Sequence, residues 1–209
     1  MTPPVLSAHD LACERSERAL FRGLGFDLGA GEALWVRGGN GHGKTSLLRI
    51  LCGLSQPAAG EVRWRGELLD RMRERYGREM AYVGHANGIK DDLTPLENLR
   101  LAAELGGREL NESNAVTALE RVGLGRCLDL PARVLSFGQR RRVALASLLT
   151  AGAVLWILDE PLTGLDVDGV AMVEGLIQDH VAAGGMAVMT THQPFAFTDI
   201  TPKSISVGE

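Results

Sequence analysis

The sequence predicts an α/β fold: a mostly parallel sheet covered by helices on both faces, with a small antiparallel β part and a helical insertion. Two continuous apolar runs, AVLWILDEP (153–161) and MAVMTTH (186–192), are typical of strands buried on both faces. Segments with helical spacing of apolar residues separate the strand-like runs, which favours parallel pairing. With 209 residues, 45% of them hydrophobic, the chain is long enough for one well-buried core.

Strand and helix signals alternate in the first part of the chain. GEALWVRGG (31–39) predicts a strand that runs into a glycine loop, and KTSLLRILCGL (44–54) predicts a helix that stops at Gly53. GEVRWRGELL (60–69) partly alternates and predicts a hairpin, whereas REMAYVGH (78–85) predicts another strand. The antiparallel part is therefore expected at the hairpin.

Helical signals dominate residues 93–135. Thr94, Pro95 and Glu97 form the pattern of a capping box with proline at the first helical position. A second helix is expected over ESNAVTALERVGLG (112–125), which stops in glycines. We therefore expect one domain over 1–209, with a core of 1–92 and 136–209 and a helical subdomain at 93–135.

The last third of the chain begins with the longest apolar run, VALASLLTAGAVLWIL (143–158). Its 16 residues are too few for a membrane-spanning helix, and Gly152 interrupts them, so a buried helix, a turn and a buried strand are expected. VEGLIQDHVAAGG (173–185) predicts a further helix. The N-terminus lacks the apolar core of a signal peptide. We expect a chain that does not cross a membrane by itself, although it could dock on one.

Charge and cysteine content exclude several classes of protein. A net charge of −4 gives no general case for nucleic-acid binding. Cys13, Cys52 and Cys127 are far apart and have no CxxC or zinc-ligand spacing. Reduced thiols in a cytosolic protein are expected, and neither a disulfide framework nor a cysteine-based metal or haem site is indicated.

GGNGHGKT (38–45) matches the pattern GxxxxGK[ST], with a strand before it and a helix after it. Glycines allow successive backbone N–H groups to turn toward phosphate oxygens, and the helix N-terminus adds its positive end. Lys44 is expected to reach the β- and γ-phosphates and Thr45 to bind Mg²⁺. The alternative is a glycine-rich turn that arose by chance. The expected nucleotide-binding residues are Gly38, Gly39, Asn40, Gly41, His42, Gly43, Lys44, Thr45 and Ser46, of which His42 fits a solvated loop position better than a catalytic one.

Asp159 and Glu160 follow a predicted strand. In a protein with a phosphate loop, Asp159 is expected to hold Mg²⁺ through water and Glu160 to orient and polarise the attacking water. Adjacent residues of an extended backbone point in different directions, which fits two separate roles. The alternative is a strand-end turn with solvated acids.

LSFGQRRR (135–142) contains Ser136 and Gln139 at the spacing of a capping box. Taken alone, this stretch favours the start of a helix and nothing more. A helix N-terminus with serine and glycine is also suited to binding an anion. The residues themselves leave both interpretations open.

The order of motifs resembles the ATP-binding cassette (ABC) ATPases: a phosphate loop, LSFGQ, a strand ending in DE, LTGLD and TTHQP. The resemblance covers nearly the whole chain and implies ATP hydrolysis with Mg²⁺ by a head-to-tail dimer of two copies. The signature of one copy then contacts the γ-phosphate held by the other. The matching signature residues are Leu135, Ser136, Gly138 and Gln139, and Phe137 replaces the first glycine.

The resemblance also assigns roles to single residues. Asp166 matches the D-loop, and His192 matches the switch histidine that contacts the γ-phosphate, so Lys44, Glu160 and His192 form the implied catalytic set. His85 stands where the family has the Q-loop glutamine and could bind a metal-bound water. Arg15 aligns with the aromatic residue that stacks on adenine; a guanidinium stacks on a base, but a solvated surface charge is an equal alternative.

Within the family, the resemblance is strongest to the haem-exporter ATPases of cytochrome c maturation. The stretches that carry it are CERSERALF (13–21), VGHANGIKDDLTPLENL (83–99), LWILDEPLTGLDVDGVA (155–171) and TTHQP (190–194). It implies a peripheral position on the cytoplasmic face of the bacterial inner membrane and integral membrane partners similar to CcmB and CcmC. ATP hydrolysis would drive haem export or the release of a haem-loaded chaperone.

Other interpretations remain open from the sequence. They are the ATPase of another ABC exporter, a soluble ABC ATPase acting on ribosomes or DNA, and an ordinary phosphate-loop kinase. The kinase would not need LSFGQ, LTGLD or His192.

Two stretches of the chain are candidate surface segments. By resemblance, residues 85–100 are expected to dock on a membrane partner. The arginine-rich stretch 63–78 is expected to be a solvated face.

Overall fold

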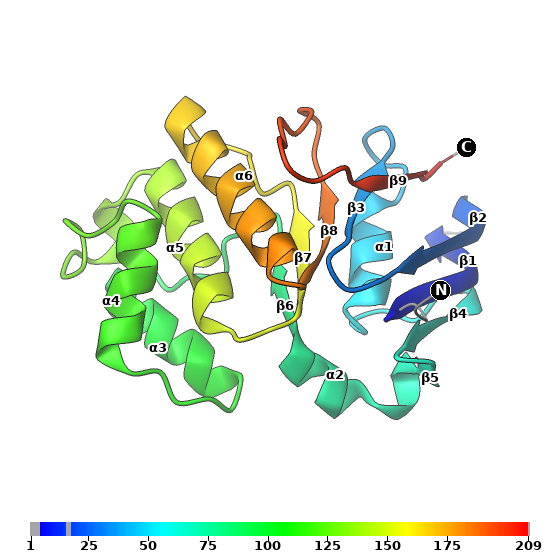
Figure 1. Cartoon of the computed structure of the whole chain (residues 1–209), viewed down its shortest axis with the longest axis horizontal. Helices are drawn as coiled ribbons and strands as arrows, with labels where there is room; N and C mark the ends of the chain where they lie inside the picture. Colours follow the sequence, from blue (N-terminus) through cyan, green and yellow to red (C-terminus); the bar gives the residue numbers. More distant parts are fainter. Residues whose placement is uncertain (1–4, 16–17, 209) are drawn as a thin grey trace.

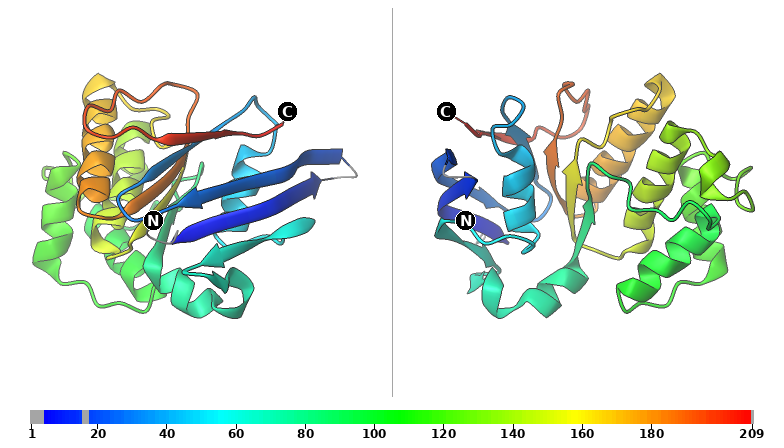
Figure 2. Two further views of the ribbon diagram at one scale, coloured as in Figure 1. Left: turned by 45° about the vertical axis from the view of Figure 1, so that its right-hand side comes forward. Right: turned by 180° about the vertical axis from the view of Figure 1, so that it is seen from behind.

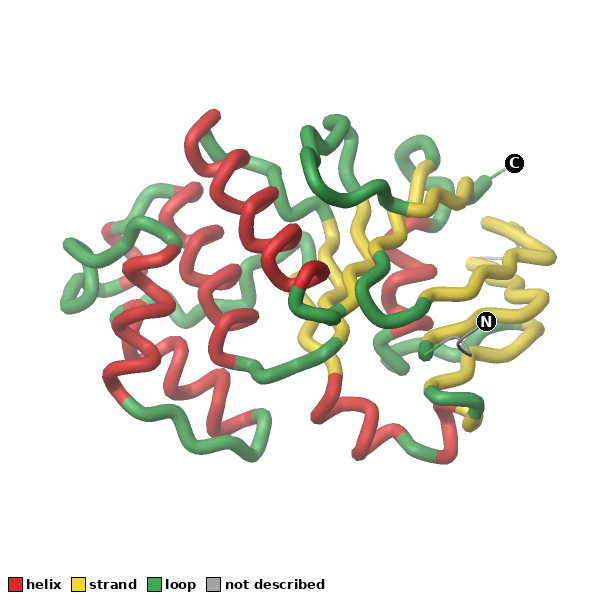
Figure 3. The backbone as a smooth tube through the Cα atoms, viewed as in Figure 1, coloured by secondary structure: helices red, strands yellow, loops and turns green. Residues whose placement is uncertain are grey.

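The computed structural model describes residues 5–15 and 18–208, which form two sheets and the helices around them (Figures 1 and 3). The larger sheet has five strands in the order β6-β7-β8-β3-β9, and all its described pairs are parallel. This confirms the predicted mostly parallel sheet. Its strands are β3 (Ala33–Arg37), β6 (Met80–Val83), β7 (Leu155–Asp159), β8 (Met186–Thr190) and β9 (Lys203–Ser206).

The smaller sheet is antiparallel, with the order β2-β1-β4-β5. The predicted hairpin is present, because Arg63 of β4 pairs with Leu68 of β5. The long strands β1 and β2 were not expected from the sequence, because register shifts in β1 break the alternation of buried and exposed residues. Of the CERSER stretch, Ser16 and Glu17 lie outside the described residues. The strands of this sheet are β1 (Leu6–Arg15), β2 (Arg18–Leu28), β4 (Ala59–Trp64) and β5 (Glu67–Leu68).

Helices flank the parallel sheet on both sides (Figure 2). On one side lies α1, together with the antiparallel sheet; on the other lie α5 and α6, with α3 and α4 outside them. The helices are α1 (Lys44–Leu51), α2 (Arg73–Glu79), α3 (Pro95–Leu105), α4 (Glu112–Arg121), α5 (Phe137–Thr150) and α6 (Val167–Ala182), with 3-10 turns at η1 (Leu69–Arg71) and η2 (Ala132–Val134).

The alternation of side chains along β7 divides the core into two clusters. Leu155 and Ile157 pack with α1 and the antiparallel sheet, whereas Trp156 and Leu158 pack with α5 and α6. All four side chains are at most 4% exposed. A parallel strand buried on both faces reads as a continuous apolar run, which explains why this strand was predictable. Each fully buried leucine of this kind contributes about 1.5–3 kcal/mol to the hydrophobic free energy of folding.

The region between β6 and β7 is helical, as expected. Thr94 and Glu97 form a reciprocal capping box at the start of α3, with Pro95 at the first helical position. α3 and α4 pack against α5. The division of the chain at residues 93 and 135 stays a prediction, since one continuous hydrophobic cluster contains residues from α3, α4, α5 and the sheet.

The long apolar run at 143–158 folds as predicted into the end of α5, a turn and β7. Gly152 takes a left-handed φ of 60° in that turn. Over 5–15 and 18–208, none of the helices has both the length and the apolar character that crossing a bilayer requires.

Candidate nucleotide-binding site

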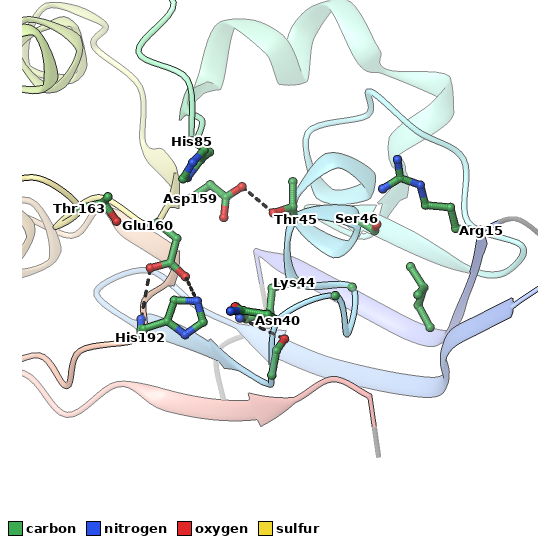
Figure 4. A pocket seen from close by; sticks show the side chains of 14 residues that line it. Arg15, Asn40, Lys44, Thr45, Ser46, His85, Asp159, Glu160, Thr163 and His192 are labelled. Carbon is green, nitrogen blue, oxygen red and sulfur yellow. Dashed lines mark hydrogen bonds and ion pairs between the residues drawn. The ribbon is translucent and has the colours of Figure 1, made fainter. Parts of the chain in front are cut away.

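A pocket of about 550 Å³ lies where the phosphate loop faces the carboxyl ends of β7 and β8 (Figure 4). Parallel strands meet with their carboxyl ends at one edge of a sheet, and ligands of open α/β folds bind there. The lining residues come from β1, β2, the phosphate loop with the start of α1, the end of β7, and the loops after β6, β7 and β8: Arg15, Leu20, Gly39, Asn40, Gly41, Gly43, Lys44, Thr45, Ser46, His85, Asp159, Glu160, Thr163 and His192.

The phosphate loop brings a buried cation to the N-terminus of α1. Lys44 is 8% exposed, and its Nζ donates to the carbonyl oxygens of Gly38 at 2.8 Å and of Gly39 at 3.3 Å. Gly43, at the N-cap, has a φ of 100°, and a Cβ there would lie 3.0 Å from the Leu20 side chain. Glycine is therefore required at this position, and the first N–H groups of α1 are left without a capping side chain. This arrangement fits phosphate oxygens.

Thr45 and Asp159 meet across the pocket. Thr45 Oγ1 donates a hydrogen bond to Asp159 Oδ2 at 2.8 Å, and Thr190 Oγ1 donates to Asp159 Oδ1 at 2.7 Å. A hydroxyl and a carboxylate are hard oxygen ligands of the kind that Mg²⁺ prefers. The described residues contain no group of three or more His, Cys, Asp or Glu that could hold a metal alone. One hydroxyl and one carboxylate are too few ligands for Mg²⁺ by themselves, so the pair of Thr45 and Asp159 fits an ion whose remaining ligands are water and substrate phosphate.

Glu160 and His192 form a second pair of contacting side chains in the pocket. His192 Nε2 lies 3.3 Å from Glu160 Oε1, and the His192 backbone N–H donates to Glu160 Oε2 at 3.2 Å (Figure 4). Glu160 Oε1 is buried, and the His192 ring contact does not have the geometry of a hydrogen bond, so this oxygen receives none within the described chain. A buried carboxylate oxygen of this kind is suited to accept a proton or hydrogen bond from a water in the pocket.

His85 and Arg15 lie at opposite ends of the pocket. Figure 4 shows His85 near Asp159 and Glu160, whereas Arg15 is beyond Ser46 at the far end. Both side chains are exposed. Both residues line the pocket, and the roles expected for them stay predictions.

Two residues of the predicted phosphate loop do not line this pocket. Gly38 contributes its carbonyl oxygen to Lys44, and a Cβ on it would lie 2.6 Å from the Val207 carbonyl oxygen. The ring of His42 is directed at Gly39 and Gly208, where added Cβ atoms would lie within 3.2 Å and 2.5 Å of His42 atoms. His42 therefore packs beside the loop.

The signature lies away from the pocket and begins α5. The capping box is complete: Gln139 N donates to Ser136 Oγ at 3.1 Å, and Ser136 N donates to Gln139 Oε1 at 2.9 Å. Leu135 is buried, whereas Ser136 is exposed. A Cβ on Gly138 would lie 2.9 Å from the Gly164 carbonyl oxygen. Within one copy of the chain, Ser136 therefore acts as a helix cap, and its exposed position leaves it open to a second copy.

Asp166 caps α6 by accepting from the Gly169 N–H at 3.0 Å and pairs with Arg142 at 2.6 Å. These two contacts, the backbone hydrogen bond first, hold the pKa of Asp166 below its usual value. The D-loop is thus tied to the signature helix, since Arg142 belongs to α5.

Two functional candidates were missed by sequence reasoning. Thr190 connects the Asp159 side chain to the Glu160 backbone, because its Oγ1 donates to the Asp159 carboxylate and accepts from the Glu160 N–H at 3.0 Å. Arg141 is buried under the same residues. The threonine at the end of an apolar strand gave no distinctive signal, and Arg141 was one of three arginines in a run.

Known proteins are similar to this chain over most of its length. A family model for "ABC transporter" matches residues 21–163. "Cytochrome c biogenesis ATP-binding export protein CcmA" of Nitrosospira multiformis is 55% identical over 190 residues, covering 91% of this chain and 92% of that protein. The protein of the same name from Aromatoleum aromaticum is 54% identical over 207 residues, covering 99% of this chain and 96% of that protein.

Solved structures show the same architecture. A "Putative ABC transporter (ATP-binding protein)" from Pyrococcus furiosus superposes with a TM-score of 0.84 at 23% identity, covering 97% of this chain and 96% of that chain. A structure described as "ATP binding subunit of ABC transporter" has a TM-score of 0.80 at 27% identity, covering 90% and 79%. The chain therefore belongs to the ABC transporter ATP-binding family and, within it, to the CcmA group of cytochrome c biogenesis ATP-binding export proteins.

Proposed function

We propose that the chain is the ATP-hydrolysing subunit of a membrane ABC complex for cytochrome c maturation, which drives haem export or the release of a haem-loaded chaperone. The observation that carries the hydrolytic part is the convergence of Lys44, Thr45–Asp159 and Glu160–His192 on one pocket. The assignment to cytochrome c maturation rests on relatives that are 50–55% identical over most of the chain.

In the proposed mechanism, the phosphate loop binds the triphosphate. The N–H groups at the start of α1 and the ammonium of Lys44 neutralise the β- and γ-phosphates, and Lys44 exchanges its loop carbonyl partners for phosphate oxygens. Mg²⁺, held through Thr45 and Asp159, would neutralise charge on the phosphates. Arg15 would stack on the base at the far end of the pocket.

Glu160 would orient the attacking water and accept its hydrogen bond through Oε1. His192, which contacts Glu160 through both its ring and its backbone, would hold that carboxylate and reach the γ-phosphate. His85 would contact a water on the metal side. Each group acts by position and charge, which is where the catalysis of phosphoryl transfer chiefly lies.

We propose that a second copy of the chain completes the site. None of the signature residues lines the pocket of its own copy. Ser136 and Gly138 at the exposed start of α5 would contact the γ-phosphate bound by the partner copy. Integral membrane subunits similar to CcmB and CcmC would bind the segment at 85–100 and hold the chain on the cytoplasmic face of the bacterial inner membrane.

The test is a pull-down of tagged Glu160→Gln protein with Mg-ATP from gently solubilised membranes, with Lys44→Ala as the matched control that should not bind ATP. Recovery of cytochrome c maturation membrane subunits with Glu160→Gln supports the proposal. Recovery of other permease subunits would keep the ATPase mechanism and reject the haem assignment. Bait that remains in the soluble fraction without a membrane partner would favour a soluble ABC ATPase.

A further inference from the structure

Arg141 is an arginine on α5 that is buried to 1% exposure, two residues beyond the signature. Its five hydrogen bonds within the described chain all end on carbonyl oxygens rather than on carboxylates. Burial lowers the pKa of Arg141, while the nearby charges of Asp159 and Glu160 raise it. A guanidinium buried without a paired carboxylate is costly, so its set of acceptors calls for an explanation.

One side of the guanidinium holds the end of β7. Nη2 donates to the carbonyl oxygens of Asp159 at 2.9 Å and Glu160 at 2.8 Å, and Nε donates to that of Pro161 at 3.3 Å. Glu160 has a φ of 51°, in the left-handed region that a non-glycine residue adopts at a cost. Such a conformation persists only where the surroundings hold it. Arg141 donates to the carbonyl oxygen of Glu160 itself and to those of the residues before and after it, Asp159 and Pro161.

The other side of the guanidinium holds the loop after β6. Nη1 donates to the Gly84 carbonyl oxygen at 2.7 Å and to Asn87 Oδ1 at 3.2 Å. His85 lies between these two acceptors and lines the same pocket as Glu160 (Figure 4). One side chain on the signature helix therefore connects the two loops that carry Glu160 and His85.

We propose that Arg141 is a positioning residue for ATP hydrolysis, which holds Glu160 and His85 in a fixed relation to the signature helix. A planar guanidinium presents five N–H donors in a fixed fork, so it spans both loops at once. A lysine ammonium keeps the charge but offers three donors from one point and cannot span them. Because Arg141 is part of α5, a shift of α5 would also move the carbonyl groups that fix the backbone conformation of Glu160. This inference rests on the proposed ATPase function.

The experiment compares Arg141→Lys with Arg140→Lys in the full chain. Arg140 is on the same helix, partly exposed, and lies 3.6 Å from Asp91 in a surface ion pair. Both changes conserve charge, and only Arg141→Lys removes the buried fork. We expect Arg141→Lys to lower kcat by about 10–100-fold, because small displacements of catalytic groups have effects of this order, with the Kd for ATP changed by less than about twofold. Arg140→Lys should leave both quantities within about twofold of wild type.

Equal kcat in the two variants would overturn the inference. A loss of ATP affinity that matches the loss of kcat would also overturn it, since that result indicates a general disturbance of the pocket. If Arg141→Lys shows no cooperative thermal transition, Asn87→Ala decides, because it removes a single acceptor on the His85 side. It should lower kcat by about two- to fivefold at unchanged Kd, within what a misplaced group costs; an unchanged kcat would reject the inference.

Wild-type protein separates this inference from the proposed function. If wild type hydrolyses ATP and Lys44→Ala does not, the ATPase holds and the Arg141 comparison is decisive. If wild type hydrolyses no more ATP than Lys44→Ala, with and without membrane partners, the proposed function fails and the positioning role fails with it.

Discussion

The ring of Phe137 occupies the space that a side chain on Gly164 would take, so the signature and the D-loop lie side by side within one copy of the chain. A Cβ built on Gly164 would lie 2.3 Å from the Phe137 ring atom Cε1. Phe137 replaces the first glycine of the expected signature, and its side chain is still half exposed. The departure from the family pattern is therefore accommodated by a glycine in the D-loop.

We predict that Gly164→Ala destabilises the protein and that Phe137→Ala relieves part of the loss. The alanine methyl group would overlap the ring, and φ of 76° at this position adds strain. A double-mutant cycle by urea unfolding should give a coupling of about 0.5–3 kcal/mol. Gly152→Ala is the matched control, since Gly152 has a φ of 60° with no atom within 4 Å of its added Cβ. Additive effects of Gly164→Ala and Phe137→Ala would show that the contact is unimportant.

Glu160→Gln should reduce the single-turnover hydrolysis rate by about 10²–10⁴-fold, because the amide cannot act as a general base. ATP affinity should be retained, since the substitution leaves Lys44 and the phosphate loop intact. His192→Ala should have a smaller effect, because Glu160 keeps its backbone contact to residue 192. Rapid-quench hydrolysis and equilibrium nucleotide binding measure the two quantities. Turnover by Glu160→Gln at the wild-type rate would remove Glu160 from the water-orienting role.

Thr45→Val should raise the Mg²⁺ concentration needed for half-maximal hydrolysis by about tenfold, because it removes a hydroxyl ligand and its hydrogen bond to Asp159. Binding of ATP without metal should change little, since Lys44 and the backbone N–H groups remain. A Mg²⁺ titration of the hydrolysis rate, with chelator as the zero point, makes the measurement. An unaltered Mg²⁺ requirement would place the metal elsewhere in the pocket.

His180 should make stability depend on pH near neutrality. Its ring stacks on Trp156 at 3.9 Å, and its Nε2 contacts the Met186 carbonyl oxygen at 3.2 Å. Burial lowers the pKa of His180 from its usual value of 6.5, so the unfolded chain binds the proton more tightly. The contribution to stability is complete above pH 6.5 and declines as the pH falls through that value toward the lower folded-state pKa.

Urea unfolding at about pH 7.5 and 5.5 tests this effect, on either side of the ordinary histidine pKa. His180→Phe keeps an aromatic ring on Trp156 but cannot titrate. It should lower stability at the higher pH by about 1 kcal/mol, because the Met186 carbonyl oxygen loses its partner. The difference in stability between the two pH values should be smaller in His180→Phe than in wild type. Equal differences would show that His180 does not titrate in this range.

The fold was predictable where local patterns are strong. β7 and β8 are continuous apolar runs because both faces of a parallel strand are buried, and the capping box at Thr94 marks the start of α3. β1 was missed because its bulges interrupt the alternation of buried and exposed residues. α2 was missed because it is seven residues long and only Tyr76 is buried in it.

The candidate site divides in the same way. The spacing of the phosphate loop is a local property, so Lys44 and Thr45 could be identified from the residues alone. Arg141 and Thr190 could not, because their importance lies in acceptors and donors supplied by distant segments. A run of three arginines does not reveal that the middle one is buried.

By itself, the sequence determined the phosphate loop, the helix caps, the buried strands and the order of motifs, since each depends on neighbours within a few residues. Only the tertiary structure decided which of these meet. Thr45 and Asp159 are 114 positions apart, and Glu160 lies 32 positions from His192. They come together because β7, β8 and β3 are neighbours in a parallel sheet, which gathers their carboxyl ends at one edge. Strand order follows from packing of the whole chain, which no local pattern encodes.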